Sequence, residues 1–254
     1  MVLSGIVPIV RGSGFVRTVV QKFLLWYQGV RGMEGNRLMQ IKKIVDLTMP
    51  IKNSMQIYPG DPKPDIRPAA NLDTDSFNLH YINIGSHTGT HVDSPYHLLR
   101  SGQRINQCDL SLFTGRGVVI NVTGKGEKEP IEMKDVESYL ERLRPGIIVL
   151  FHTGWPIYSG EEKYFRNPYV KVEVVEEMIH RGIRSFFIDT SNIDSAGDMT
   201  FPAHRAIFEI SGVIGENLTN IEGIDFENPW IVAFPLKIIG CDGSPVRCVA
   251  LDTV

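Results

Sequence analysis

Cysteine is scarce in this chain of 254 residues, which contains only Cys108, Cys241 and Cys248. The number is odd, and no two of them form a C-x-x-C pair. The sequence therefore argues against a disulfide framework of the kind that staples small secreted domains. We expect free, structural thiols and a reducing, cytoplasmic location.

Long apolar runs and an excess of positive charge are also missing. No stretch reaches the roughly 18 apolar residues that a membrane-spanning helix needs, so no membrane span is expected. The chain carries 26 lysine and arginine residues against 29 aspartate and glutamate residues, for a net charge of −3. Proteins that bind nucleic acid normally carry a basic face, so no nucleic-acid partner is expected.

Three common catalytic signatures are absent. There is no G-x-S-x-G elbow, which disfavours a serine hydrolase of the α/β type. There is no H-E-x-x-H pair, so a zinc site on one helix is not indicated. The glycine-rich segment 11–14 lacks the lysine of a phosphate-binding loop and follows no clear strand.

Residues 1–40 do not fit the order of a secretory signal, which is basic, then apolar, then small. Residues 15–29 could form an amphipathic helix that packs on the domain or on a partner, or lies on a membrane surface. The natural start could instead be Met33 or Met39. We therefore treat residues 1–40 as an N-terminal extension, helical or non-native, and residues 41–254 as the domain.

The domain alternates short apolar strands with amphipathic helices. Its composition, 43% hydrophobic and 22% charged residues, is that of a soluble globular protein large enough to bury a core. We expect a half-buried strand at 77–84 because apolar and polar residues alternate there. The class is a single α/β domain with a mixed sheet. The further expected strands are 44–47, 117–122, 147–151, 186–188, 230–234 and 246–251, and the expected helices are 134–143, 172–181 and 203–210.

The most informative positive feature is the run H-T-G-T-H-V-D-S-P-Y-H at 87–97. Three of the seven histidines, His87, His91 and His97, fall in it together with Asp93. Glycine, threonine and proline are poor in a helix interior, so we expect a loop leaving a strand. In extended chain His91 and Asp93 point the same way, and a turn at Gly89 brings His87 to the same point.

Three protein ligands and an open position are typical of a catalytic metal, and imidazole with carboxylate suits zinc or manganese. His97 is then a fourth ligand or a nearby acid/base. The alternative is a purely structural role, in which these histidines cap loops or satisfy hydrogen bonds in the core. A further pair, His204 and Glu216, is equally compatible with a second metal position and with a salt bridge, since Glu216 lies in an apolar stretch and needs a partner charge or a metal.

The run matches the signature H-x-G-T-H-x-D-x-P-x-H, and the chain thereby resembles the putative cyclase family of kynurenine formamidases and isatin hydrolases. The resemblance extends over residues 44–251. It includes the opening segment 58–62, the blocks 153–155, 189–191 and 235–237, and a histidine followed twelve residues later by a glutamate, His204 and Glu216.

The resemblance implies a swivelling β/β/α fold, a homodimer or homotetramer, and one or two Zn²⁺ ions or a single Mn²⁺. His87, His91 and Asp93 would hold the first metal. Asp93 would bridge to a second metal held by His204 and Glu216, and His97 would be the catalytic acid/base.

The implied activity is hydrolysis of a small amide, most simply N-formylkynurenine to kynurenine and formate, by a metal-activated hydroxide. The alternatives are an isatin-like cyclic amide or a lactone as substrate, or a metal-binding protein without turnover.

Overall fold

The computed structural model describes residues 40–253, of which Ile41–Thr253 form one compact unit. The helices are α2 (Leu72–Asp75), α3 (Met133–Val136), α4 (Val172–His180) and α5 (Pro202–Glu209). The strands are β1 (Ile41–Asp46), β2 (Asp65–Ala70), β3 (Leu79–Asn83), β4 (His91–Asp93), β5 (Thr114–Asn121), β6 (Pro130–Ile131), β7 (Ile148–His152), β8 (Tyr169–Val170), β9 (Ser185–Ile188), β10 (Val213–Glu216), β11 (Trp230–Val232), β12 (Gly243–Pro245) and β13 (Val249–Thr253).

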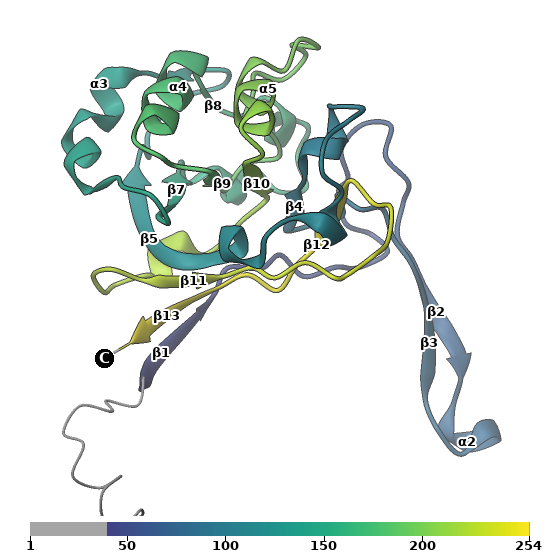
Figure 1. Ribbon diagram of the computed structural model, residues 1–254. Coiled ribbons are helices and arrows are strands. Elements are labelled where there is room, and N and C mark those ends of the chain that lie inside the picture. Colours follow the sequence, from purple (N-terminus) through teal and green to yellow (C-terminus); the bar gives the residue numbers. More distant parts are fainter. Residues whose placement is uncertain (1–39, 254) are drawn as a thin grey trace, which may run out of the picture. The chain divides into compact units, whose positions relative to one another are not determined.

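Within residues 40–253, nine strands form one mixed sheet in the order β1-β13-β11-β5-β7-β9-β10-β4-β12 (Figure 1). The four central strands, β5, β7, β9 and β10, run parallel, and the pairs on either side of them are antiparallel. Central parallel strands are buried on both faces and read as continuous apolar runs, as β7 does with Ile-Val-Leu-Phe. The expected α/β class with a mixed sheet is confirmed.

The sheet separates two hydrophobic clusters because successive side chains of a strand point to opposite faces. Val149 and Phe151 of β7 pack with the inner faces of α4 and α5, which cover one face of the sheet (Figure 1). Ile148 and Leu150 of the same strand point to the other face. Leu218 belongs to the cluster on that face, and an isolated antiparallel bridge joins it to Thr48.

Strand β4 decides where the site lies. It is held antiparallel between β10 and β12, and all three of its residues are buried. The expectation of a loop over 87–95 was therefore wrong for His91–Asp93. The partners of this short strand come from more than a hundred residues later in the chain, so the local sequence does not announce it.

The helix expected over 134–143 is also shorter than its pattern suggested. Helix α3 ends at Val136 and continues as a 3₁₀ turn over Glu137–Arg142. Helix α4 agrees with expectation and is followed by Gly182, whose φ of 84° is the left-handed conformation that ends helices.

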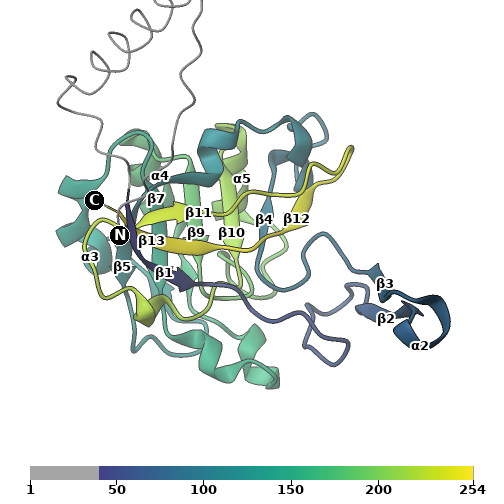
Figure 2. The same cartoon turned by 90° about the horizontal axis from the view of Figure 1, so that it is seen from below.

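Strands β2 and β3 form a separate two-stranded hairpin that projects away from the main sheet in both views (Figures 1 and 2). We call this hairpin, residues 65–83, the arm. A strand lies where one was expected, but the expected half-burial was wrong, because all five residues of β3 are exposed. The alternating pattern that normally marks one buried face has no partner surface among the described residues.

The expectations for residues 1–39, including the amphipathic helix at 15–29 and a start at Met33 or Met39, lie outside the described residues. Among residues 40–253, no helix has the length and apolar character needed to cross a bilayer.

Candidate metal centre

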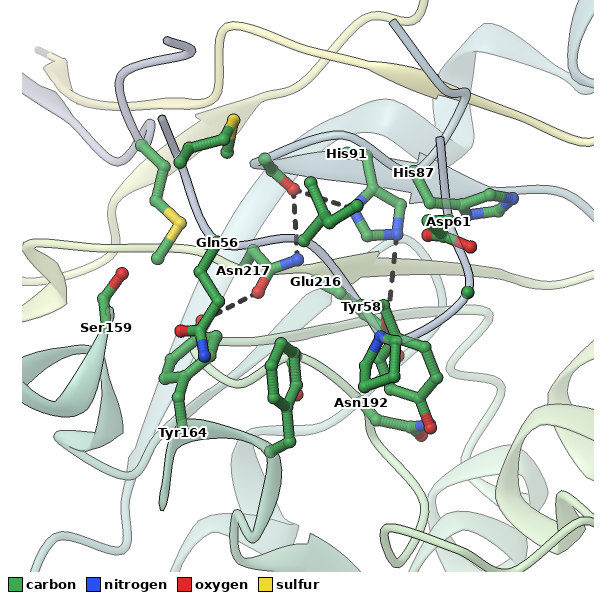
Figure 3. A pocket seen from close by; sticks show the side chains of 18 of the residues that line it. Gln56, Tyr58, Asp61, His87, His91, Ser159, Tyr164, Asn192, Glu216 and Asn217 are labelled. Atoms are coloured by element: carbon green, nitrogen blue, oxygen red, sulfur yellow. Dashed lines mark hydrogen bonds and ion pairs between the residues drawn. The ribbon is translucent and has the colours of Figure 1, made fainter. Parts of the chain in front are cut away.

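All six residues singled out from the sequence line one cavity of about 600 Å³. Figure 3 shows part of its wall, with His87 and His91 on one side and Tyr164 and Asn192 on the other. The cavity lies at the end of the sheet where β4 and β10 meet. The six residues are His87, His91, Asp93, His97, His204 and Glu216.

Strand pairing brings His91, Asp93 and Glu216 together. His91 and Asp93 are two residues apart on β4 and therefore point the same way, and His91 lies opposite Glu216 of β10. The Nε2 atom of His91 is 3.3 Å from Asp93 Oδ1 and 3.7 Å from Glu216 Oε2. All three side chains are buried, so their charges have little solvent to screen them.

His87 joins them through a tight turn before β4. Gly89 in this turn has a φ of 67°, which glycine adopts without steric cost. His87 Nδ1 then lies 2.7 Å from Asp93 Oδ1. Gly243 of β12 makes room for this approach, because a Cβ at residue 243 would lie 3.0 Å from the His87 ring.

His204 comes from the first turn of α5 and is placed by Asp194. The Asp194 carboxylate accepts hydrogen bonds from the backbone amides of Ala203 and His204, and from His204 Nδ1 at 2.7 Å. A carboxylate at a helix N-terminus is favoured by the free amides there. His204 Nε2 consequently faces Glu216 Oε1 at 3.5 Å and Asp93 Oδ2 at 3.8 Å.

His97 closes the cluster from the 3₁₀ turn Pro95–His97. Its ring centroid is 4.3 Å from that of His87 and 6.1 Å from that of His204. One potential ligand atom of His97 lies within 4.8 Å of atoms of Asp93 and His204. At 30% exposure its side chain is more open than the other histidines of the cluster.

The donor set fits a divalent metal. His87, His91 and His204 each turn one nitrogen toward Asp93, while the other nitrogen meets a fixed acceptor: the Asp242 carboxylate, the Gly89 carbonyl and the Asp194 carboxylate. This is how metal-binding imidazoles are normally oriented.

Within the described part of the chain, one oxygen of the carboxylate at the centre of the cluster makes no hydrogen bond. Buried Asp93 Oδ1 has no hydrogen bond of acceptable geometry within residues 40–253, although His87 Nδ1 is only 2.7 Å away. The short approach is thus an ion-pair contact by distance and not a hydrogen bond by angle, as expected where a nitrogen and an oxygen both face a common point.

Neighbouring carboxylates raise the pKa values of two histidines in the cluster. Burial opposes protonation of His87, but the carboxylates of Asp93 and Asp242 outweigh it and raise the pKa of His87 to about 11. Burial likewise opposes protonation of His204, and Asp194, Asp93 and Glu216 raise its pKa to about 10.

The pKa values of the two carboxyl groups in the cluster shift in opposite directions. Burial and the neighbouring charge of Asp93 raise the pKa of Glu216. The pKa of Asp93 lies well below its usual value because the attraction of His87 and His91 outweighs its burial.

Sequence reasoning missed the residues that orient the cluster. Asp242 and Asp194 are the clearest cases, and each follows an apolar residue immediately before a turn or loop. Tyr164 and Asn217 were also missed; the Tyr164 hydroxyl donates to Asn217 Oδ1 at 2.7 Å on the cavity wall (Figure 3). A polar residue beside an apolar run was the available signal, but it names no partner.

Fold and site together define a protein of the cyclase family, and comparison with known proteins agrees. The family model described as "Putative cyclase" matches residues 45–195. The chain belongs to this family. The matched range contains the run 87–97 but ends before His204, Glu216 and Asp242.

Individual relatives were found by sequence and by structure. A kynurenine formamidase of Bacillus anthracis is 27% identical over 221 residues, which cover 83% of this chain and 98% of the relative. An isatin hydrolase bound to the product analogue thioisatinate has a TM-score of 0.76 at 19% identity, covering 96% of this chain and all of the other. A predicted metal-dependent hydrolase from Bacillus stearothermophilus has a TM-score of 0.69 at 25% identity, covering 84% and 98%.

Proposed function

We propose that this protein is a metal-dependent hydrolase of a small amide, of the arylformamidase type. The observation that carries the proposal is the convergence of six ligand and acid/base side chains on one cavity wall, drawn from four separate elements and from the turn before β4. A merely structural metal site closes all its positions with protein ligands, whereas this cluster opens onto a cavity. The kynurenine formamidase relative supports the same reaction class.

Two metal positions share Asp93. His87, His91 and Asp93 would hold the first, and Asp93 with His204 and Glu216 would hold the second. The distances between these side chains support the sharing, because Asp93 Oδ1 faces His87 and His91 while Oδ2 faces His204. Imidazole and carboxylate ligands suit Zn²⁺ or Mn²⁺. When bound, the metal supplies a Lewis acid that polarises a carbonyl and lowers the pKa of water.

His97 is proposed as the acid/base. It is the most exposed histidine of the cluster, and it borders both the cavity and the proposed ligands. Hydrolysis adds water to the amide carbon and breaks the carbon–nitrogen bond, and the departing amine needs a proton to leave. His97 accepts the proton of the attacking water and delivers it to that nitrogen.

The cavity wall supports an aromatic amide as substrate. Away from the cluster the wall carries apolar and aromatic side chains, which bury ring surface, and nearly as many polar ones, which can orient a substrate. N-formylkynurenine is the first candidate. The apolar and aromatic lining includes Met49, Met55, Tyr58, Phe165 and Phe201.

A cyclic amide of the isatin type is the second candidate, because the isatin hydrolase fold matches nearly the whole chain. Ring opening needs the same attack of water on the amide carbon, but the acid and the amine that it forms stay in one molecule. A cavity of about 600 Å³ accommodates either substrate.

The deciding experiment is a hydrolysis assay on purified protein of known metal content. N-formylkynurenine, formanilide and isatin are compared side by side with zinc and with manganese. We expect formate release from an aryl formamide, and a large fall in turnover with retained metal in His97→Asn. Turnover of isatin alone would favour the second candidate, and no turnover of any amide by fully loaded protein contradicts the proposal.

We also propose a homodimer in which a second copy covers the arm. An isolated two-stranded hairpin is marginal in water, and this one exposes apolar side chains on both faces. Such a surface is typical of an interface. The exposed arm residues are Leu72, Phe77, Leu79, Tyr81 and Ile82.

The arm proposal is tested by light scattering after gel filtration. We expect Ile82→Asp to lower the oligomer mass to that of one chain. Leu110→Asp, an equally exposed apolar position outside the arm, is the matched control. An unchanged mass for Ile82→Asp contradicts the arm interface.

We further propose a cytoplasmic location, which the free thiols of Cys108, Cys241 and Cys248 support.

A further inference from the structure

Asp242 joins two histidines to which the proposed mechanism gives different tasks. Its Oδ2 atom lies 2.8 Å from His87 Nε2 and 3.1 Å from His97 Nδ1. The residue lies 155 positions after His87 and 145 after His97, in the turn before β12. One carboxylate oxygen thus touches both a proposed metal ligand and the proposed acid/base.

An ionised carboxylate accepts hydrogen bonds and cannot donate them. Asp242 Oδ2 lies within hydrogen-bond distance of one nitrogen of His87 and one of His97, and as a carboxylate oxygen it accepts from both. The two nitrogens that face it must therefore carry hydrogen. This fixes the tautomer of each neutral ring: His87 keeps a lone pair at Nδ1, toward Asp93, and His97 keeps one at Nε2.

Asp242 is itself held firmly. Its Oδ1 atom accepts a hydrogen bond from Ser86 Oγ at 2.9 Å. Its backbone carbonyl accepts from the backbone amide and the hydroxyl of fully buried Ser94, both at 2.8 Å. Because both its side chain and its backbone are held by hydrogen bonds, the Asp242 carboxylate is suited to orienting the histidine rings that bind to it.

We propose that Asp242 is the positioning residue of the acid/base. It holds His97 in the tautomer and ring orientation that leave Nε2 free for proton transfer, and it ties this ring to the ligand His87. The inference rests on the proposed function, because His97 is the acid/base only there. Asp242 acts through His97 and does not touch the reacting atoms.

The geometry also contains a competing arrangement. His87, His97 and Asp242 could together hold a cation themselves, since their ligand atoms lie within 4.8 Å of one another. That arrangement would use His87 Nε2, whereas the site around Asp93 uses Nδ1. We favour the positioning role because His87 Nδ1 is directed at buried Asp93, whose Oδ1 makes no hydrogen bond within residues 40–253.

The first test is a double-mutant cycle on the zinc-loaded enzyme with an aryl formamide. We expect Asp242→Asn to lower kcat about 10²- to 10⁴-fold, the range for losing the tautomer control of a catalytic histidine, with KM changed by less than about threefold. Asp242→Glu keeps the carboxylate and should recover part of kcat. In a His97→Asn background, Asp242→Asn should cost less than about twofold more, because residues that act as one unit are not additive.

The second test does not depend on turnover. Nitrogen-15 NMR of the histidine side chains of the zinc-loaded protein should show His97 with its proton on Nδ1. Asp242→Asn should shift His97 toward a mixture of tautomers while bound zinc stays unchanged. Asp225→Asn, the same change at an exposed carboxylate paired with Lys43, should leave the spectrum and kcat at wild-type values.

Three results overturn the inference: a wild-type His97 spectrum in Asp242→Asn, a full additional loss of kcat in the His97→Asn background, or a loss of zinc affinity on replacing Asp242 that exceeds the roughly 100-fold expected when an orienting group is lost. The last assigns Asp242 to metal binding. If no amide is turned over by wild-type enzyme, the proposed function fails while the NMR result still decides the positioning role. If Asp242→Asn does not fold, the spectrum and kcat of Asp242→Glu decide it.

Discussion

Replacing Asp93 by Asn tests the centre of the proposed metal site. The change keeps the shape of the side chain but removes the charge that lies between His87, His91 and His204 at 2.7, 3.3 and 3.8 Å. Asp93 is the only carboxylate assigned to both metal positions. We therefore expect its loss to weaken binding at both, and by at least the roughly 10- to 100-fold that follows loss of a group merely orienting a ligand.

The expected effect on thermal stability follows from mass action. A ligand at about 1,000 times its Kd stabilises the native state by about 4.1 kcal/mol, and at about 10 times Kd by about 1.4 kcal/mol. A domain of this size gains about 2–4 °C in Tm for each kcal/mol. Saturating zinc should thus raise the wild-type Tm by about 8–16 °C, and a 100-fold weaker site should cut this to about 3–6 °C.

The assay is thermal melting with and without zinc, together with metal analysis after gel filtration. Asp225→Asn is the control, since its ion pair with Lys43 is exposed to solvent, contributes little to stability and touches no proposed ligand. Full metal occupancy in Asp93→Asn, with the wild-type rise in Tm, would refute the assignment. A loss of zinc with an unchanged fold by circular dichroism supports it.

Three further outcomes are expected. The pKa values of His87 and His204 are raised above 6.5, to about 11 and about 10. Their stabilisation of the metal-free protein is therefore complete below about pH 6.5 and is lost as the pH rises through 10 and 11. Thermal melts in chelator should show Tm falling over that pH range, and a rising Tm would contradict the shifts. His204→Ala should lower bound zinc from two equivalents to one by metal analysis; two retained equivalents would remove it from the ligand set. In Gly102→Ala, the new Cβ would lie 2.4 Å from the backbone carbon that begins the turn of His97, so kcat and Tm should both fall, whereas Gly126→Ala, which meets only ordinary contacts, should change neither.

The run 87–97 could be understood from sequence because its information is local. His91 and Asp93 share a face by the two-residue period of extended chain, and Gly89 supplies the turn that His87 needs. Composition nevertheless suggested a loop, since glycine, threonine and proline crowd the segment. The strand exists because β10 and β12 supply hydrogen bonds on both sides of it, and local propensity does not register such partners.

The residues that orient the site could not be predicted for the same reason. Asp194 and Asp242 look like ordinary loop aspartates until the fold brings them to His204 and to His87 with His97. The arm shows the opposite failure. The alternation in β3 correctly predicted a strand. No surface within residues 40–253 buries the apolar side chains of that strand. The alternating pattern indicates that one face is buried, but it does not indicate which surface buries it.

The position of β4 between β10 and β12 has a consequence for the order in which the protein matures. The ribosome makes His87, His91 and Asp93 early, but these residues gain their neighbours only when the chain has been extended past Pro245. A nascent chain that ends near residue 200 carries the complete signature run and neither flanking strand. The proposed metal site can therefore assemble only after synthesis has passed Pro245, about 150 residues beyond the signature run.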